Sequence, residues 1–166
     1  MKTRSLIIAA LCLTLTACCT DTTPAQQPTE QATEQPAPVV LSPPAEHGTL
    51  MNDLAYEITA GDYSASQYQE RGYHLDVIDG KYRYTICSGE RSTGGYGIKI
   101  KGLDCLDCGT VIVTVEETTP APDMTVTEAF TYPNCAITFS YEPPDGILIQ
   151  TADGIAFEDL GTTTEP

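Results

Sequence analysis

A short stretch of the chain alternates strictly between large apolar residues and glycine or lysine, with Tyr96, Ile98 and Ile100 at every second position. A period of two is typical of a strand with one buried face, because successive side chains of a strand point to opposite faces. Gly94 and Gly95 come directly before it, where glycine allows a positive φ or the close approach of another segment. The sequence therefore predicts a glycine-rich turn that leads into a half-buried strand.

Similar runs of β-branched and aromatic residues recur between turn signals, and Asp79-Gly80 and segment 152–154 are typical of hairpins. The only segment that favours a helix is the short one at 64–71. The predicted strands are 54–59, 73–78, 82–88, 96–103, 110–117, 125–132, 135–141, 147–150 and 155–158. Many short strands at this spacing predict an all-β fold, a small antiparallel β-sandwich or partly open barrel with at most one short helix.

The same period predicts which side chains form the core. Burying each of them contributes about 1.5–3 kcal/mol, so we expect the domain to hold together without a structural metal. The predicted core residues are Val111, Val113, Val115, Val126, Phe130, Ile137, Phe139, Tyr141, Tyr82, Tyr84, Ile86, Tyr96, Ile98 and Ile100.

The first 17 residues have the features of an export signal. Basic residues precede a nearly uninterrupted apolar run at 6–15, which is shorter than the ~20 residues needed to span a bilayer. The run ends in Leu15-Thr16-Ala17-Cys18, which resembles the lipobox of bacterial lipoproteins. The resemblance implies cleavage before Cys18 and a lipid on its sulfur; the alternative is an ordinary signal peptide with an incidental cysteine.

Residues 18–50 are predicted to be a lipidated cysteine followed by a disordered tether. This stretch is rich in Pro, Thr, Gln and Glu and has few large apolar side chains, so it cannot bury enough surface to offset its ordering entropy. Residues 51–163 change to a β-rich composition, and their number suits one domain. We therefore expect a single domain, tethered to the outer side of a bacterial cell membrane by lipid.

The formal net charge of the chain is −15, from 23 acidic and eight basic residues. Such a surface repels nucleic acid and anionic lipid headgroups. We therefore expect no nucleic acid partner, contact with the membrane through the lipid anchor only, and a protein partner in the cell envelope.

Four cysteines lie in the predicted domain, and in an exported chain they indicate two disulfides with three possible connectivities. The local pair Cys105–Cys108 is favoured because it lies in one turn, which leaves Cys87–Cys135. The second pair is awkward, since Cys87 is out of step with the core-facing positions of its strand. A redox-active Cys-x-x-Cys is disfavoured because acidic neighbours destabilise a thiolate, and a zinc site would need a second such pair.

Sequence signatures of catalysis are missing from the chain. It contains no Gly-x-Ser-x-Gly, His-Glu-x-x-His or phosphate-binding motif, and its histidines are His47 and His74. His74 lies in a predicted strand, where a structural role is the simpler interpretation. We therefore expect a protein that is not an enzyme and that needs no cofactor and no metal.

The glycine-rich turn carries the clearest family resemblance. Residues 89–98, Gly-Glu-Arg-Ser-Thr-Gly-Gly-Tyr-Gly-Ile, resemble the G-x-R-x-T-G-G-Y-x-I signature of the PrcB C-terminal domain family, and segments 113–120 and 130–133 resemble a second block. The resemblance implies a β-rich domain found on bacterial lipoproteins, non-catalytic and supporting the assembly or stability of a surface protease complex. Its candidate interaction residues here are Arg91, Ser92, Thr93, Gly94, Gly95, Tyr96, Thr131, Tyr132 and Pro133.

Two other hypotheses stay open. Ser92-Thr93-Gly94-Gly95-Tyr96 is similar to a loop of chagasin-like cysteine protease inhibitors, in which a neighbouring aromatic–proline loop, here Tyr132-Pro133, also enters the protease cleft. That similarity implies a protease inhibitor, although the family's Asn-Pro is absent. The other hypothesis is a purely structural domain in which Gly94-Gly95 only starts a strand.

Overall fold

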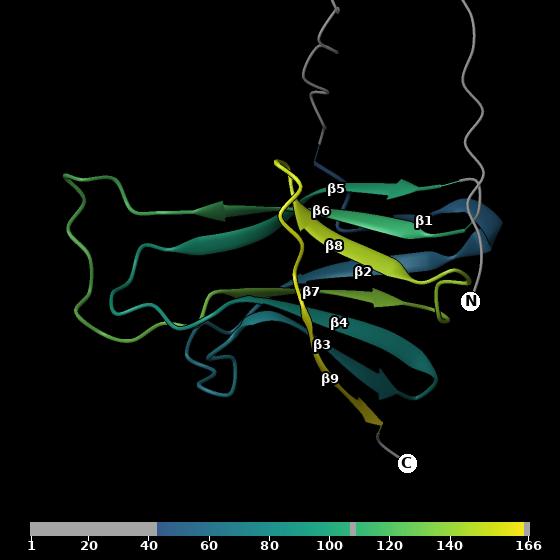
Figure 1. The fold of residues 1–166 in the computed structure, drawn as a ribbon, viewed down its shortest axis with the longest axis horizontal. Coiled ribbons are helices and arrows are strands. Elements are labelled where there is room, and N and C mark those ends of the chain that lie inside the picture. Colours follow the sequence, from purple (N-terminus) through teal and green to yellow (C-terminus); the bar gives the residue numbers. More distant parts are fainter. Residues whose placement is uncertain (1–42, 107–108, 165–166) are drawn as a thin grey trace, which may run out of the picture. The chain divides into compact units, whose positions relative to one another are not determined.

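The computed structural model describes residues 43–106 and 109–164. The predicted signal peptide, Cys18, most of the predicted tether and Cys108 lie outside the described residues. Two β-sheets make up the described part (Figure 1). The strands are β1 (His47–Thr49), β2 (Ala55–Ala60), β3 (Arg71–Ile78), β4 (Lys81–Ser88), β5 (Gly97–Cys105), β6 (Val111–Thr118), β7 (Asn134–Phe139), β8 (Ile147–Thr151) and β9 (Asp159–Thr164), with one 3₁₀ turn, η1 (Met51–Asp53).

The larger sheet has the strand order β1-β2-β7-β4-β3-β9, and the smaller has the order β5-β6-β8. Neighbouring strands are antiparallel except for two parallel pairs, β3 with β9 and β6 with β8. Neither sheet closes into a barrel. The predicted small all-β fold is therefore confirmed, with parallel pairs that local sequence patterns did not indicate.

The core lies between the two sheets. Val111, Val113 and Val115 of β6 pack in one cluster with Ile137 and Phe139 of β7. The alternation that predicted these positions is therefore confirmed for the central strands. The rest of the cluster is Leu54, Tyr84, Ile86, Ile98, Ile100, Cys135, Ile149 and Phe157.

Two predicted strands are wrong, and so are four core assignments, among them Tyr96, which is only partly buried and lies outside the core cluster. Segment 125–132 forms only an isolated bridge at Thr131, and segment 155–158 only one at Ala156, because both cross from the smaller sheet to the larger. Segment 125–132 makes only scattered backbone hydrogen bonds to loop 89–96, and segment 155–158 bonds to the edge strand β8 only briefly before the chain leaves for β9, so neither extends into a regular ladder. Consequently Val126 is only partly buried, Phe130 is 63% exposed and Tyr141 is 36% exposed.

The predicted helix at 64–71 is also wrong. Ser64 instead donates both its backbone N–H and its hydroxyl to Asp62 Oδ1, at 2.9 and 2.6 Å. Such local side-chain bonds compete with helix formation. The segment folds as successive turns that lead into β3, while β1 lies inside the stretch assigned to the tether, so strands begin before the predicted boundary at residue 51.

The predicted Cys87–Cys135 disulfide is not formed, and both thiols are free and buried. Cys87 lies opposite Asn134, whereas Cys135 lies opposite Ile86. The two cysteines are thus one position out of register, and one position places their side chains on opposite faces of the sheet. Cys105 is also a free thiol, and Cys108, its partner in the favoured local bridge, lies outside the described residues.

Candidate functional site

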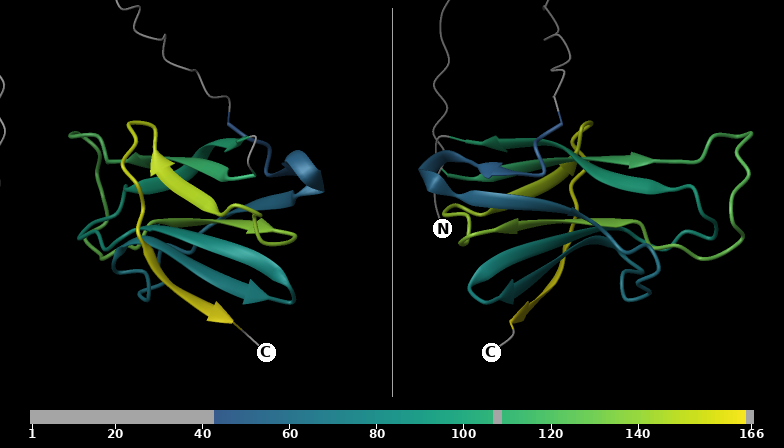
Figure 2. Two further views of the ribbon diagram at one scale, coloured as in Figure 1. Left: turned by 45° about the vertical axis from the view of Figure 1, so that its right-hand side comes forward. Right: turned by 180° about the vertical axis from the view of Figure 1, so that it is seen from behind.

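The two predicted interaction loops lie together at one end of the sheets. Loop 89–96 leads from β4 to β5, and loop 119–133 leads from β6 to β7, so each crosses between the sheets. We call residues 89–96 and 119–131 the arm, which extends beyond the strand ends at the left of Figure 1 and is seen from behind in Figure 2. Arg91 and Thr131 form an antiparallel bridge, with N–H···O distances of 2.9 Å in both directions.

Further contacts hold the two loops of the arm against each other. The backbone N–H of Gly94 donates to the carbonyl of Thr127, and the Thr131 hydroxyl donates to the carbonyl of Thr93, both at 2.9 Å. Gly95 has a φ of +87°. A Cβ at this position would lie 2.8 Å from Pro120 Cβ and 2.9 Å from Val126 Cγ1. Both predicted reasons for glycine, a positive φ and a close approach, therefore apply at Gly95.

Charged side chains fix the base of the arm to the sheets. Glu117 of β6 accepts two hydrogen bonds from Arg71 of β3, at 3.1 and 3.0 Å. The second carboxylate oxygen of Glu117 lies 3.8 Å from Arg91. The guanidinium of Arg91 also lies over the ring of Tyr96, 5.4 Å from its centroid. Arg91 therefore takes part in holding the arm together.

Tyr132 and Pro133 are buried at the same base, which removes them from the predicted interaction surface. The Tyr132 hydroxyl donates to Glu90 Oε2 at 3.1 Å, and its backbone N–H donates to the carbonyl of Tyr63. Burial and the Glu90 carboxylate both raise the pKa of the Tyr132 hydroxyl. These two residues anchor the loop and cannot enter a protease cleft in this conformation.

Of the predicted interaction residues, Ser92 and Gly95 are exposed, but the large exposed apolar side chains of the arm are ones that the sequence does not point to. Phe130 is 63% exposed and Met124 is 54% exposed, and both lie in loop 119–133. A connection of that length without regular structure is uncommon inside a domain, and such loops are often functional. The β-favouring composition of residues 125–132 masks that signal, because it predicts a strand there.

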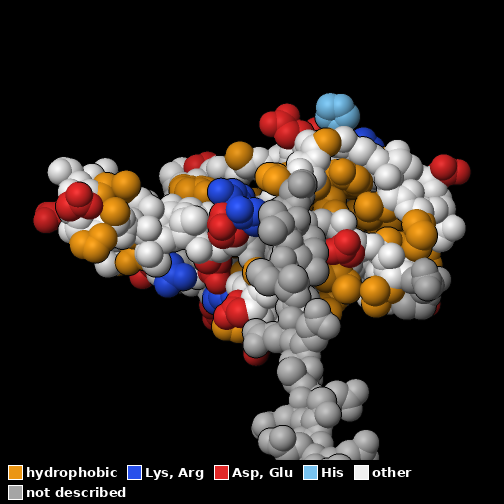
Figure 3. All heavy atoms as spheres, turned by 90° about the horizontal axis from the view of Figure 1, so that it is seen from above, with side chains coloured by type: hydrophobic (Ala, Val, Ile, Leu, Met, Phe, Trp, Pro, Cys, Tyr) orange, Lys and Arg blue, Asp and Glu red, His pale blue; other side chains and the backbone are white. Residues whose placement is uncertain are grey.

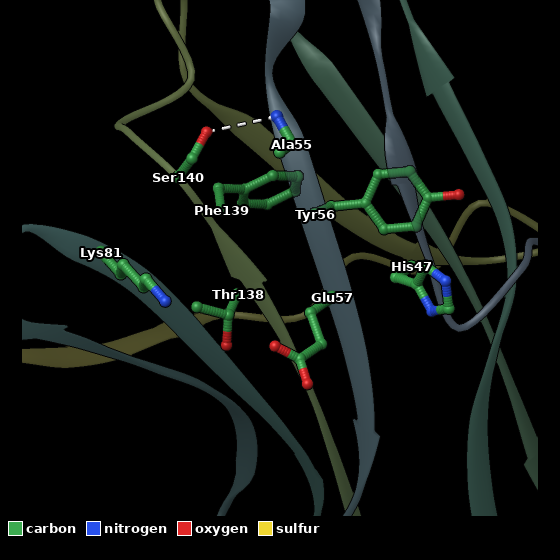
Figure 4. Close-up of a pocket in the computed structure, with 8 residues that line it drawn as sticks. All are labelled: His47, Ala55, Tyr56, Glu57, Lys81, Thr138, Phe139 and Ser140. Atoms are coloured by element: carbon green, nitrogen blue, oxygen red, sulfur yellow. Dashed lines mark hydrogen bonds between the residues drawn. The ribbon is translucent and has the colours of Figure 1, made fainter.

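The described residues also contain shallow hollows over the larger sheet. One, of about 350 Å³, is lined by residues of β1, β2, β4 and β7, among them His47, Glu57 and Lys81 (Figure 4). A second, of about 280 Å³, shares Lys81 and Thr138 with it. Within the described ranges, no group of three or more His, Cys, Asp or Glu side chains is arranged to bind a metal ion, and no helix is long and apolar enough to span a membrane.

Comparison with known proteins gives one match. Searches of curated proteins and of solved structures found no similar protein. A family model described as PrcB C-terminal matches residues 84–140, a range that begins within β4, ends just after β7 and includes the whole arm. The match suggests a domain associated with a protease complex. Segment 84–140 of this chain is therefore similar to the PrcB C-terminal family, the family that the sequence resemblance named.

Proposed function

We propose that the protein is a lipid-anchored lipoprotein whose β domain binds another protein of the cell envelope through the arm and does no catalysis itself. An exported protease or its complex is the partner class that the family match favours. Cys18 is the proposed lipidation site, and the segment between it and β1 is the proposed tether. The domain would thus present the arm on the outer side of the membrane.

The observation that carries this proposal is the pairing of the two loops. Backbone hydrogen bonds at Arg91, Gly94 and Thr131, and the tight packing of Gly95, hold the arm in one conformation. A surface that is ordered before binding loses less conformational entropy when a partner arrives. A loop pair that served only to connect strands would gain nothing from projecting exposed Phe and Met side chains.

The arm can be tested by a matched pair of glycine substitutions. Gly95 and Gly154 have nearly the same φ, +87° and +85°, but only Gly95 has neighbours that a Cβ would meet. The full-length tagged lipoprotein is purified from detergent-solubilised membranes of its native cells. We expect the wild type and Gly154→Ala to retain the same stoichiometric partner, and Gly95→Ala to lose it. Equal retention by both variants would contradict a role for the arm.

The anchor is tested separately through Cys18. Metabolic labelling with palmitate should mark the wild-type protein, and Cys18→Ala should abolish the label and release the protein from the membrane fraction. Cys19→Ala is the control and should keep the label. A labelled Cys18→Ala protein would contradict the assigned site.

The inhibitor hypothesis makes a different prediction. An inhibitor lowers the turnover of the protease that it binds, whereas the proposed module leaves turnover intact and raises the amount or the lifetime of its partner. Assaying the isolated partner with and without the purified lipoprotein distinguishes the two. The burial of Tyr132 and Pro133 removes one of the contacts on which the inhibitor hypothesis rested.

A further inference from the structure

The outer part of the arm is an apolar surface with acidic residues among its apolar ones. Residues 121–130 form the tip, and the space-filling view shows apolar and acidic side chains mixed at this end of the molecule (Figure 3). Asp123 and Glu128 lie in the same ten residues, which contain no Lys, Arg or His. The exposed apolar residues of the tip are Ala121, Pro122, Met124, Ala129 and Phe130.

These side chains are exposed because the backbone beneath them is held. Phe130 directly precedes Thr131, whose backbone is paired with Arg91. Met124 closes a turn by donating its N–H to the carbonyl of Ala121 at 3.0 Å. Val126, between them in sequence, packs against Gly95. The tip therefore exposes the side chains of Phe130 and Met124 to solvent. Backbone hydrogen bonds and the packing of Val126 against Gly95 stabilise the loop beneath them.

We propose that the tip docks into an apolar pocket rimmed by Lys or Arg side chains on a protein partner. This inference rests on the proposed function and names the chemistry of the partner. Large, exposed aromatic and Met side chains are the usual anchors of protein interfaces, and they fill pockets on the other surface. The two carboxylates beside them would be left without partners unless the rim of the pocket is basic.

The charge of the tip also argues against two other binding partners, an anionic membrane and a second copy of this chain. A bilayer with anionic headgroups repels the acidic tip, so Phe130 is a poor candidate for lipid insertion. A second copy of this chain carries the same net charge of −15 and the same acidic tip, so tip-to-tip contact is unfavourable. A protein whose apolar pocket is bordered by basic side chains is the partner that matches both the apolar and the acidic residues of the tip.

Site-specific photocrosslinking of the full-length lipoprotein in its native membranes tests the inference. A benzophenone amino acid replaces Phe130 in one variant, and Tyr141 in the control. Tyr141 is an exposed aromatic that follows β7, at the end of the sheets opposite the arm. We expect adducts from position 130 with one protein, mapped to an apolar pocket that Lys or Arg residues border. Adducts with lipid, with a second copy, or with an acidic or polar surface would overturn the inference.

The same experiment separates this inference from the proposed function. Protein adducts from position 141 alone, with the partner still retained in purification, would overturn docking by the tip and leave a protein-binding module intact. Absence of protein adducts at both positions, together with loss of any co-purified partner, would overturn both.

Affinity measurements with the crosslinked partner complete the test. Phe130→Ala should weaken binding by about 30-fold or more, as for a central anchor, and Ile155→Ala, which truncates an exposed apolar residue elsewhere, should change it less than about threefold. Asp123→Lys should also weaken binding, and the loss of affinity should be larger at low salt than at high salt. Binding that is insensitive to Asp123→Lys and to salt would contradict the basic rim.

Discussion

Phe139 and Phe130 carry the same side chain, but one is buried between the sheets and the other is exposed to solvent. Phe139 of β7 is fully buried and packs edge to face with Tyr84, with ring centroids 5.9 Å apart. Phe130, in the loop before β7, is 63% exposed. In the sheets, apolar burial provides the stability. In the arm, backbone hydrogen bonds and a tightly packed glycine provide the order, which leaves the large apolar side chains exposed.

This difference separates residues that stabilise the fold from residues that, under the proposed function, contact a partner. Removing an apolar side chain from the sheets should lower the free energy of unfolding. Removing one from the tip should change binding and little else. The arm is also expected to open locally at a lower free energy than the sheets, because fewer buried contacts hold it.

The largest expected effect is Phe139→Ala, which leaves a cavity between the sheets and should lower the free energy of unfolding by about 3–5 kcal/mol. The same substitution at Phe130 should change it by no more than about 0.5 kcal/mol. Urea titrations of the two variants and the wild type measure both values. A loss above about 2 kcal/mol for Phe130→Ala would show that the tip is part of the core and would remove the contrast.

Gly95→Ala should open the arm while the sheets stay folded. Alanine at a positive φ costs about 1–2 kcal/mol, and the contacts with Pro120 and Val126 add about 1–3 kcal/mol. Hydrogen exchange should therefore lose protection at Gly94 and Thr131 and keep it in β4 and β7. Gly154→Ala has the same φ penalty without the contacts, so loss of arm protection in that variant would contradict the packing role of Gly95.

Alkaline pH should destabilise the sheets. Burial raises the pKa of Cys87 and Cys135 from 9.0 to about 12, and burial together with nearby acidic and tyrosine side chains raises that of Tyr84 from 10.0 to about 12. Below pH 9 the three groups are protonated in both states, and their stabilising contribution is fully present. Between pH 9 and 12 the unfolded chain loses these protons first, so the stability falls.

Urea titrations at intervals from pH 8 to 11 measure this decline. Tyr84→Phe removes one of the three groups and should give a shallower dependence on pH, whatever its effect on stability at pH 8. A stability that is constant from pH 9 to 11 would show that the three groups titrate alike in the folded and unfolded chain.

The smallest effect is expected at the charged base of the arm. Glu117→Gln removes the shared partner of Arg71 and Arg91 and should cost about 1 kcal/mol, because the pair is partly solvated. Glu116→Gln breaks more exposed pairs with Lys99 and Lys101 and should cost less. Thermal unfolding of both variants at low and high salt compares them. Equal losses would show that Glu117 does not connect the arm to the sheets.

Much of the arm could be anticipated from single residues, and part of it could not. Gly95 was predicted to allow a close approach, and Pro120 and Val126 are the residues that approach it. Phe130 was assigned to the core because its run is β-favouring. Nothing in that run shows that β6 and β7 belong to different sheets, so that the connection must cross a gap and has no strand to pair with.

The sequence by itself determined the local properties of this protein: the positions of the central strands, the buried faces of β4 to β7, and the need for glycine before β5. These follow from a period of two and from steric limits on φ, which act between neighbours in the chain. Only the tertiary structure decided that Thr93 and Thr131, 38 residues apart, are hydrogen-bonded, and that Cys87 and Cys135 are out of register. Both depend on which strands become neighbours when the two sheets close over the core.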